Sequence, residues 1–154
     1  MRIGIDAACW SNQRGFGRFT RELLKALLKL DKENEYLFFV DPETDKMDNF
    51  PTGVSRICLD ISEAPSKAAS SSGNRSLKDI WKAAKTVSRE RLDFFFYPSV
   101  YTYFPVFTHA KKIVVVHDVI AEKYPELFFS NGTNRTLWNL KVWLAIKQAD
   151  LLMV

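Results

Sequence analysis

The sequence predicts an α/β domain, in which a mostly parallel, Rossmann-like sheet lies between two layers of helices. Six short runs of β-branched and aromatic residues alternate with longer segments whose leucines recur at helical spacing. The apolar residues of each run follow one another without polar alternation, which is typical of strands buried on both faces. Since strands that alternate with helices pair in parallel, we expect one three-layer α/β/α domain over residues 1–154.

The individual elements follow from the same two periodicities. We expect strands at residues 2–6, 35–40, 54–59, 92–97, 112–116 and 151–154. Amphipathic spacing predicts helices within 21–31, 76–92 and 134–150, with Ser76 as the N-cap of the second. The expected inward-facing side chains are Leu23, Leu24, Leu27, Leu28 and Leu30 in the first helix, Leu77, Ile80, Trp81, Ala84 and Val87 in the second, and Leu137, Leu140, Trp143 or Leu144, and Ala145 in the third.

Composition narrows the class of protein. With 154 residues, 47% of them hydrophobic, the chain can form a core of ordinary size without disulfides or metals. Its 22 basic and 18 acidic residues are interspersed, so the net charge of +4 indicates no nucleic-acid partner but a mildly basic surface that suits phosphates. Cys9 and Cys58 lack the spacing of a metal site or a disulfide framework, so no metal is expected.

No segment of the sequence predicts export or membrane insertion. The start, MRIGIDAACW, reaches Asp6 before the apolar segment of a signal peptide develops. The most apolar stretch, residues 92–107, is interrupted by prolines and is shorter than a membrane-spanning helix. We therefore expect a cytoplasmic protein. A peripheral contact with an anionic membrane face stays open for the basic helix at 21–30, although packing of its leucines in the core explains the same pattern.

The first candidate site follows the first strand, where the chain carries Gly15, Phe16, Gly17 and Arg18 at the start of a helical pattern. Ligands of open parallel sheets gather beyond the carboxyl ends of the strands. Glycines allow a ligand to approach the backbone, and a helix N-terminus offers N–H groups and a partial positive charge. This combination suits a phosphate or a diphosphate.

Two other interpretations of this segment stay open. The glycines can simply shape a strand-to-helix turn, with the neighbouring arginines solvated. Alternatively, the segment belongs to a nicotinamide-binding Rossmann site, in which Asp41 at the end of the second strand would hold a ribose. The long approach from Asp6 to Gly15 and the presence of Thr20 at the third glycine position both weaken that alternative.

The second candidate site lies at the end of the strand expected at 112–116. His117 and Asp118 come directly after it, so the imidazole is expected in the same crevice as the glycines. A structural histidine is the alternative. Asp118 suits a supporting carboxylate that orients its neighbours, whereas His109, on the polar approach to the strand, is expected at the surface.

A third group of polar and aromatic side chains follows the strand expected at 92–97. Ser99, Tyr101, Thr102 and Tyr103 come after its end, and tyrosines with hydroxyl neighbours suit stacking on a sugar. Core packing explains such a cluster equally well. No nucleophile elbow, Walker loop or carboxylate pair is present, which argues against hydrolases and kinases.

Two further segments bear on organisation. Residues 60–76 are small and polar, and they suit either a lid or partner-binding loop or a tolerated surface insertion. The apolar run from Leu151 onwards is typical of the beginning of a buried strand. We therefore expect the chain to be a fragment of a longer protein.

Five blocks together carry a resemblance to a known family. They are MRIGIDA, GFGRFTRELLKAL, YLFFV, KIVVVHDVIAEKYPELF and AIKQADLLMV. In this order they resemble the N-terminal domain of the family 4 (group 1) glycosyltransferases, retaining enzymes of the GT-B fold. Residues 41–90 contribute least to the resemblance.

The resemblance implies roles for particular residues. In that family the glycine-rich segment approaches the donor diphosphate through backbone amides, which carries over to Gly15, Phe16 and Gly17. The histidine after the fifth strand approaches the donor sugar, which carries over to His117 as the catalytic residue. Arg18 and Asp118 match neighbouring positions, whereas Ala8 stands where the family commonly has an arginine.

The resemblance also implies the reaction and the partners. Such enzymes transfer a sugar from a nucleotide-sugar to a hydroxyl of a glycan or lipid-linked acceptor, with retention and with neither metal nor other cofactor. A C-terminal domain with paired glutamates, absent here, binds most of the donor, so this acceptor-side half is expected to be inactive alone. The alternatives are a non-catalytic binding or assembly module for a glycan, lipid or protein, and a nicotinamide- or nucleotide-binding Rossmann domain.

Overall fold

The protein folds around one six-stranded sheet in which every pair of neighbouring strands is parallel. The computed structural model describes residues 1–62, 76–129 and 132–154. The strand order is β3-β2-β1-β4-β5-β6. The strands are β1 (Arg2–Asp6), β2 (Glu35–Val40), β3 (Ser55–Cys58), β4 (Phe94–Tyr97), β5 (Lys111–Val115) and β6 (Leu151–Met153). The predicted α/β class with a parallel, Rossmann-like sheet is therefore confirmed.

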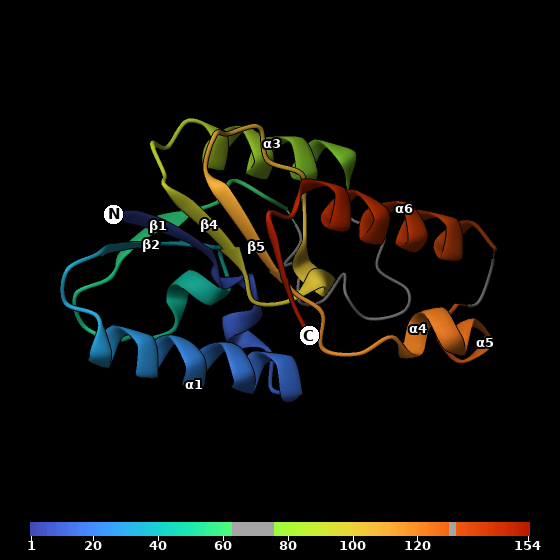
Figure 1. Ribbon diagram of the computed structural model, residues 1–154, viewed down its shortest axis with the longest axis horizontal. Coiled ribbons are helices and arrows are strands. Elements are labelled where there is room, and N and C mark those ends of the chain that lie inside the picture. Colours follow the sequence, from blue (N-terminus) through green and yellow to red (C-terminus); the bar gives the residue numbers. More distant parts are fainter. Residues whose placement is uncertain (63–75, 130–131) are drawn as a thin grey trace.

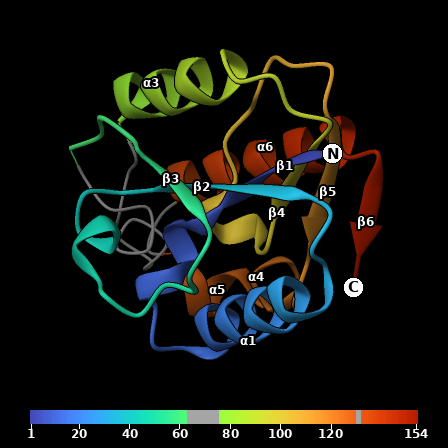
Figure 2. The same ribbon diagram turned by 90° about the vertical axis from the view of Figure 1, so that its left-hand side faces the viewer.

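Helices cover both faces of the sheet (Figures 1 and 2). Helix α1 (Gly15–Leu30) lies on one face, whereas α3 (Leu77–Ser88) and α6 (Gly132–Gln148) lie on the other. Two apolar cores follow from these layers, one that contains Leu24 of α1 and one that contains Ala83 of α3 and Ala145 of α6. The shorter helical elements are η1 (Ala7–Ser11), η2 (Thr44–Lys46), η3 (Val100–Thr102), α4 (Ile120–Lys123) and α5 (Pro125–Phe128).

The strands lie where the sequence predicts them, but two of them are not buried on both faces. β1 and β2 have the predicted bounds, and the other strands begin and end within two residues of prediction. The expectation of burial holds for most residues of the four inner strands, β1, β2, β4 and β5. It is wrong for β3 and β6, whose residues are mostly exposed. The reason is their position, since both are edge strands.

The predicted inward faces of the helices are partly wrong. Leu30, Leu77 and Trp81 are 83%, 82% and 60% exposed. In α3 an acidic side chain takes an inward position, because Asp79 accepts hydrogen bonds from the backbone N–H and the hydroxyl of Ser62. The predicted N-cap is confirmed, since the Ser76 hydroxyl accepts a hydrogen bond from the N–H of Lys78.

Helix α6 confirms the predicted inward positions of Leu144 and Ala145 but not those of Leu137 and Leu140. Its buried and half-buried apolar side chains are Trp138, Val142, Leu144, Ala145 and Ala149 near its end, whereas Leu137, Leu140 and Trp143 are about half exposed. Apolar residues occur all round this helix, so periodicity alone does not select the inward face.

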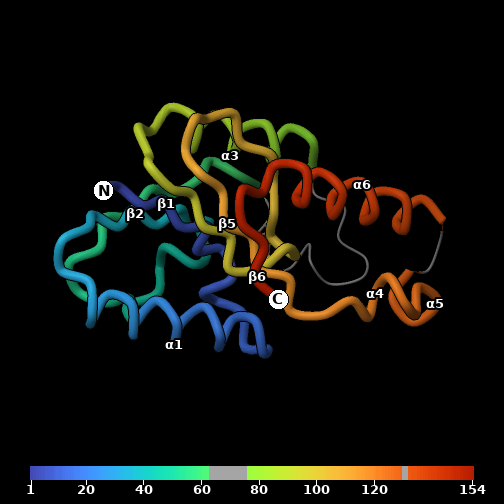
Figure 3. Tube along the Cα trace, in the orientation of Figure 1, coloured from blue at the N-terminus to red at the C-terminus, as the bar shows by residue number. Residues whose placement is uncertain are grey.

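The strands are added to the sheet first on one side of β1 and then on the other. From β1 it builds outward through β2 to β3, and then it crosses to β4 on the opposite side of β1. In sheets of this kind the crevice outside the carboxyl ends at this switch point is the usual ligand site. Figure 3 shows the start of α1 and the segments that follow β4 and β5 at this end of the sheet. Most of the loop predicted at 60–76 lies outside the described residues.

Candidate functional site

The two glycines lie within the first turn of α1, not in a loop before it. Their segment is reached through η1, whose N-cap Asp6 accepts a hydrogen bond from the N–H of Ala8. The N–H of Arg18 donates to the carbonyl oxygen of Arg14 at 3.1 Å, which is the first bond of the helix. The N–H groups of Gly15, Phe16 and Gly17 therefore have no acceptor within α1, and its N-cap residue Arg14 provides no side-chain cap.

Gly15 and Gly17 have different surroundings. A Cβ atom on Gly17 would lie 2.0 Å from the backbone oxygen of Asn12, a distance that only a shift of the backbone relieves. A Cβ atom on Gly15 would meet no described atom within 4 Å. Gly17 thus lets the start of the helix pack on its approach segment, whereas the space beside Gly15 is open.

The arginines near this turn also divide into two kinds. Arg21 is half-buried, and its Nη1 donates to the carbonyl oxygens of Trp10 at 2.6 Å and Asn12 at 2.7 Å. It holds the approach segment against α1. Arg14 and Arg18 are exposed, and neither forms an ion pair with a carboxylate in the described parts of the chain.

His117 lies just beyond β5 and contacts both the segment that follows β4 and helix α1. Its Nε2 is 2.8 Å from the carbonyl oxygen of Pro98, and its ring meets Phe19 of α1 edge to face, with ring centroids 4.8 Å apart. A carbonyl oxygen only accepts hydrogen bonds, so Nε2 carries a proton, and Nδ1 is the acceptor of the neutral ring. His117 and Asp118 are both exposed, and the Asp118 carboxylate accepts a hydrogen bond from the N–H of Ile120 at 3.1 Å.

An aromatic row joins the first turn of α1 to the segments that follow β4 and β5. Phe16 stacks on Tyr101 of η3, with ring centroids 5.4 Å apart and planes 14° from parallel. Tyr101 in turn packs against Trp138 of α6 at 5.1 Å. Burial first, and then the negative charges of Asp118 and Glu122, together raise the pKa of Tyr101 to about 12.

Lys141 fixes the far end of this aromatic row. Its Nζ lies 4.1 Å from the ring centroid of Trp138 and donates to the carbonyl oxygen of Tyr101 at 3.1 Å. The indole Nε1 of Trp138 donates to the carboxylate of Glu122 at 2.8 Å. The packed rings of Phe16, Tyr101 and Trp138 therefore hold α1, η3 and α6 together.

The hydroxyl groups of Ser99 and Tyr103 both form hydrogen bonds within the fold. The Ser99 hydroxyl is buried and accepts a hydrogen bond from the N–H of Tyr101, so that it caps η3. The Tyr103 hydroxyl donates to Oε1 of Gln148 at 2.8 Å, and burial raises its pKa well above the ordinary value. Tyr101 differs from both, because its ring stacks on Phe16 of the glycine turn.

A buried polar cluster occupies the switch point itself. Thr102 Oγ1 donates to Oδ2 of Asp6 at 2.6 Å and lies 3.3 Å from the sulfur of Cys9. These contacts tie η1, which follows β1, to η3, which follows β4. Sequence reasoning missed this cluster; its only signal was a charged residue, Asp6, closing an apolar strand.

Asp41, the residue that a nicotinamide site would use, is fully buried at the end of β2. Its carboxylate accepts hydrogen bonds from the N–H groups of Glu43 and Thr44 and from the Thr44 hydroxyl at 2.6 Å. It stabilises the turn that leads into η2. Ala8, at the position of the family's arginine, is buried as well.

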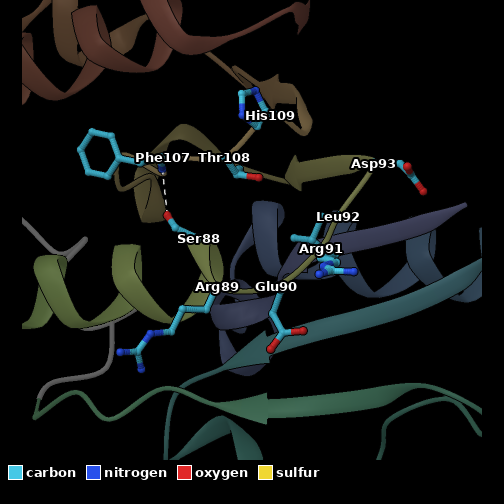
Figure 4. A pocket seen from close by; sticks show the side chains of 9 residues that line it. All are labelled: Ser88, Arg89, Glu90, Arg91, Leu92, Asp93, Phe107, Thr108 and His109. Carbon is cyan, nitrogen blue, oxygen red and sulfur yellow. Dashed lines mark hydrogen bonds between the residues drawn. The ribbon is translucent and has the colours of Figure 1, made fainter.

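A separate hollow of about 390 Å³ lies at the opposite end of β4 and β5. It is lined by residues 88–93 and 107–109 (Figure 4). Its polar side chains do not converge, since Arg89 and Glu90 extend away from His109. The hydrogen bond drawn there joins the N–H of Phe107 to the Ser88 hydroxyl at 2.9 Å.

Among the described residues, no group of three or more histidine, cysteine or acidic side chains is placed to hold a metal ion. Within residues 1–62, 76–129 and 132–154, no helix has the length and apolarity to cross a membrane.

Comparison with known proteins identifies no relative of this chain. No protein-family model, no curated protein and no solved structure matches the chain.

Proposed function

We propose that this chain is the N-terminal, acceptor-side domain of a retaining glycosyltransferase of family 4 (group 1) and GT-B type. The observation that supports this function best is the meeting of the glycine turn with both other candidate segments. Phe16 stacks on Tyr101, and Phe19 packs against His117. Three segments far apart in the sequence thereby border one area at the carboxyl end of the sheet.

The first turn of α1 would bind the diphosphate of a nucleotide-sugar. The N–H groups of Gly15, Phe16 and Gly17 lack acceptors within the helix, and the partial positive charge of a helix N-terminus favours an anion. The open space beside Gly15 allows a close approach to the backbone, and the exposed Arg18 adds a full charge. Such fixed donors would stabilise charge that develops on the leaving diphosphate.

His117 would hold a hydroxyl of the donor sugar. With Nε2 donating to Pro98, its Nδ1 is an acceptor that suits a sugar O–H. Asp118 would support the neighbouring backbone through its bond to Ile120. The acceptor would lie over Tyr101, whose ring is half-buried beside Phe16. A second domain would bind the nucleotide and complete the catalytic site, so no turnover is expected from residues 1–154 alone.

Calorimetric titration of the chain with UDP-, GDP- and ADP-glucose, and with the corresponding free diphosphates, tests this function. Because the base would bind the second domain, the three nucleotide-sugars should bind this chain alike. His117→Ala should weaken their binding about tenfold, the loss expected for one hydrogen bond of roughly 1.4 kcal/mol, and should leave the free diphosphates unaffected. Arg18→Gln should weaken both ligands.

His109→Ala is the matched control, because His109 is exposed at the opposite end of β5. It should leave all affinities unchanged. Binding of NADH in place of every nucleotide-sugar would instead support the nicotinamide alternative, and binding of none of these ligands would leave the binding-module alternative.

A further inference from the structure

Helix α3 carries large apolar side chains outside the core. Leu77 and Trp81, one helical turn apart, are 82% and 60% exposed. Phe107 is 75% exposed and lies at the end of the same helix, because its N–H donates to the Ser88 hydroxyl (Figure 4). The inward side of α3 already packs against the sheet, so these three side chains contribute nothing to the core.

Basic side chains lie on the same helix between the apolar ones. Lys78, Lys85 and Arg89 are exposed, and within residues 1–62, 76–129 and 132–154 none of them forms an ion pair with a carboxylate. The Nζ of Lys85 lies 5.1 Å from the ring centroid of Trp81. The cations and the exposed indole are therefore direct neighbours.

The carboxylates close to α3 are already neutralised by other cations. Asp60 pairs with Lys82 at 2.7 Å, and Glu90 pairs with Arg2 at 2.7 Å. The charge that remains on the outer side of the helix is therefore positive. We call this mixed apolar and basic area the α3 surface, and its residues are Leu77, Lys78, Trp81, Lys85, Arg89 and Phe107.

The composition of the α3 surface indicates which class of partner it fits. Cores of protein–protein interfaces are depleted in lysine, which argues against burial under another protein domain. A nucleic acid binds cations and aromatic rings but gains little from an exposed leucine. A membrane interface accepts all of these side chains, because leucine and aromatic rings enter the boundary of the acyl chains while lysines extend to anionic headgroups.

We propose that the α3 surface binds the face of an anionic phospholipid bilayer. Leu77, Trp81 and Phe107 enter the boundary between headgroups and acyl chains, and the basic side chains contact the lipid phosphates. The indole N–H of Trp81 has no acceptor among the described residues, which suits a ring that lies at headgroup depth.

The structure favours α3 over α1, the basic helix for which the sequence leaves a membrane contact open. Leu24 of α1 is buried, and Leu23, Leu27 and Leu28 pack against the same core. Leu30, at the end of α1, is the leucine of that helix left exposed, at 83%. Helix α1 thus has positive charge without a row of apolar side chains that could enter a bilayer.

Co-sedimentation with lipid vesicles tests the proposal. Vesicles of phosphatidylcholine and phosphatidylglycerol in equal amounts should bind the chain, and vesicles of phosphatidylcholine alone should bind it much more weakly. Lys85→Gln should weaken binding to the anionic vesicles about fivefold, the effect of one basic residue near such a surface. Leu77→Gln should weaken it about tenfold, because a leucine side chain no longer leaves water.

The same substitutions on α1 are the matched controls. Lys29→Gln changes the net charge as Lys85→Gln does, and Leu30→Gln removes a leucine that is as exposed as Leu77. Both should leave vesicle binding nearly unchanged. Circular dichroism establishes that all four variants are folded.

The depth of the indole has a separate readout. Brominated phosphatidylcholine in the anionic vesicles should quench tryptophan fluorescence of the chain, and Trp81→Phe should abolish this quenching while it preserves binding, since phenylalanine is also an apolar anchor. Failure to bind anionic vesicles, equal losses in the α1 controls, or quenching that persists in Trp81→Phe would overturn the proposal, as would binding of an oligonucleotide in place of the vesicles. No nucleotide-sugar takes part, so these results are independent of the proposed function.

Discussion

At the residue scale, the two glycines of the first turn of α1 provide a matched pair. Alanine at Gly17 would bring its Cβ to 2.0 Å from a backbone oxygen, and alanine at Gly15 would point into open space. Helix propensity favours alanine over glycine by about 1 kcal/mol at an interior position, so any loss at Gly17 reflects the clash.

We predict that Gly17→Ala lowers the free energy of unfolding by about 1–3 kcal/mol and that Gly15→Ala changes it by less than about 0.5 kcal/mol. Urea denaturation followed by tryptophan fluorescence measures both. Equal stability of the two variants would show that the approach segment moves aside without cost.

At the element scale, the contact between η3 and the first turn of α1 has a pH signature. The pKa of Tyr101 is raised to about 12 by burial first and by the charges of Asp118 and Glu122 second. Because the pKa is higher in the fold than in the unfolded chain, the stabilisation is complete below pH of about 10 and is lost as the pH rises towards 12.

We predict that the ¹³Cζ resonance of Tyr101, assigned with Tyr101→Phe, titrates near this raised value, and that Asp118→Asn lowers it. The direction follows because the substitution removes a negative charge that opposes the tyrosinate. Titration of Tyr101 at the ordinary value of about 10 would mean that its ring is not held between Phe16 and Trp138.

Elements also set the limit of what the sequence predicts. Continuous apolar runs locate β1 and β2 to the residue. Periodicity fails where its signal is weak, as in α6, whose apolar and polar residues both occur all round the helix. It also fails where a polar contact overrides it, as in α3, where Asp79 faces Ser62.

The candidate site was predictable to the same extent. The rule that carboxyl ends of parallel strands share one edge brings His117 near the glycine turn from sequence alone. The bond between Asp6 and Thr102 joins residues 96 positions apart, and no local pattern encodes it. By contrast, Ser99 and Asp41 accept hydrogen bonds from residues only two or three positions further along the chain, so these capping roles were open to prediction from local sequence.

At the scale of the whole molecule, the candidate site lies at one end of the parallel sheet. Its carboxyl end gathers the glycine turn, His117 and Tyr101, whereas its β6 edge carries exposed apolar side chains without charge. The amino end of β4 and β5 holds a hollow whose polar groups diverge. The proposed chemistry therefore belongs to the carboxyl end of the sheet.

The central claim is that the first turn of α1 binds a nucleotide diphosphate through its backbone. The most direct test follows the backbone amide resonances of the ¹⁵N-labelled chain while UDP, GDP or ADP is added. Because the base would bind the second domain, we predict that each of them shifts the amide signals of Gly15, Phe16 and Gly17 most strongly and in a saturable way. Diphosphates that leave these three signals in place, or that shift only residues around the hollow at 88–93, would contradict the claim.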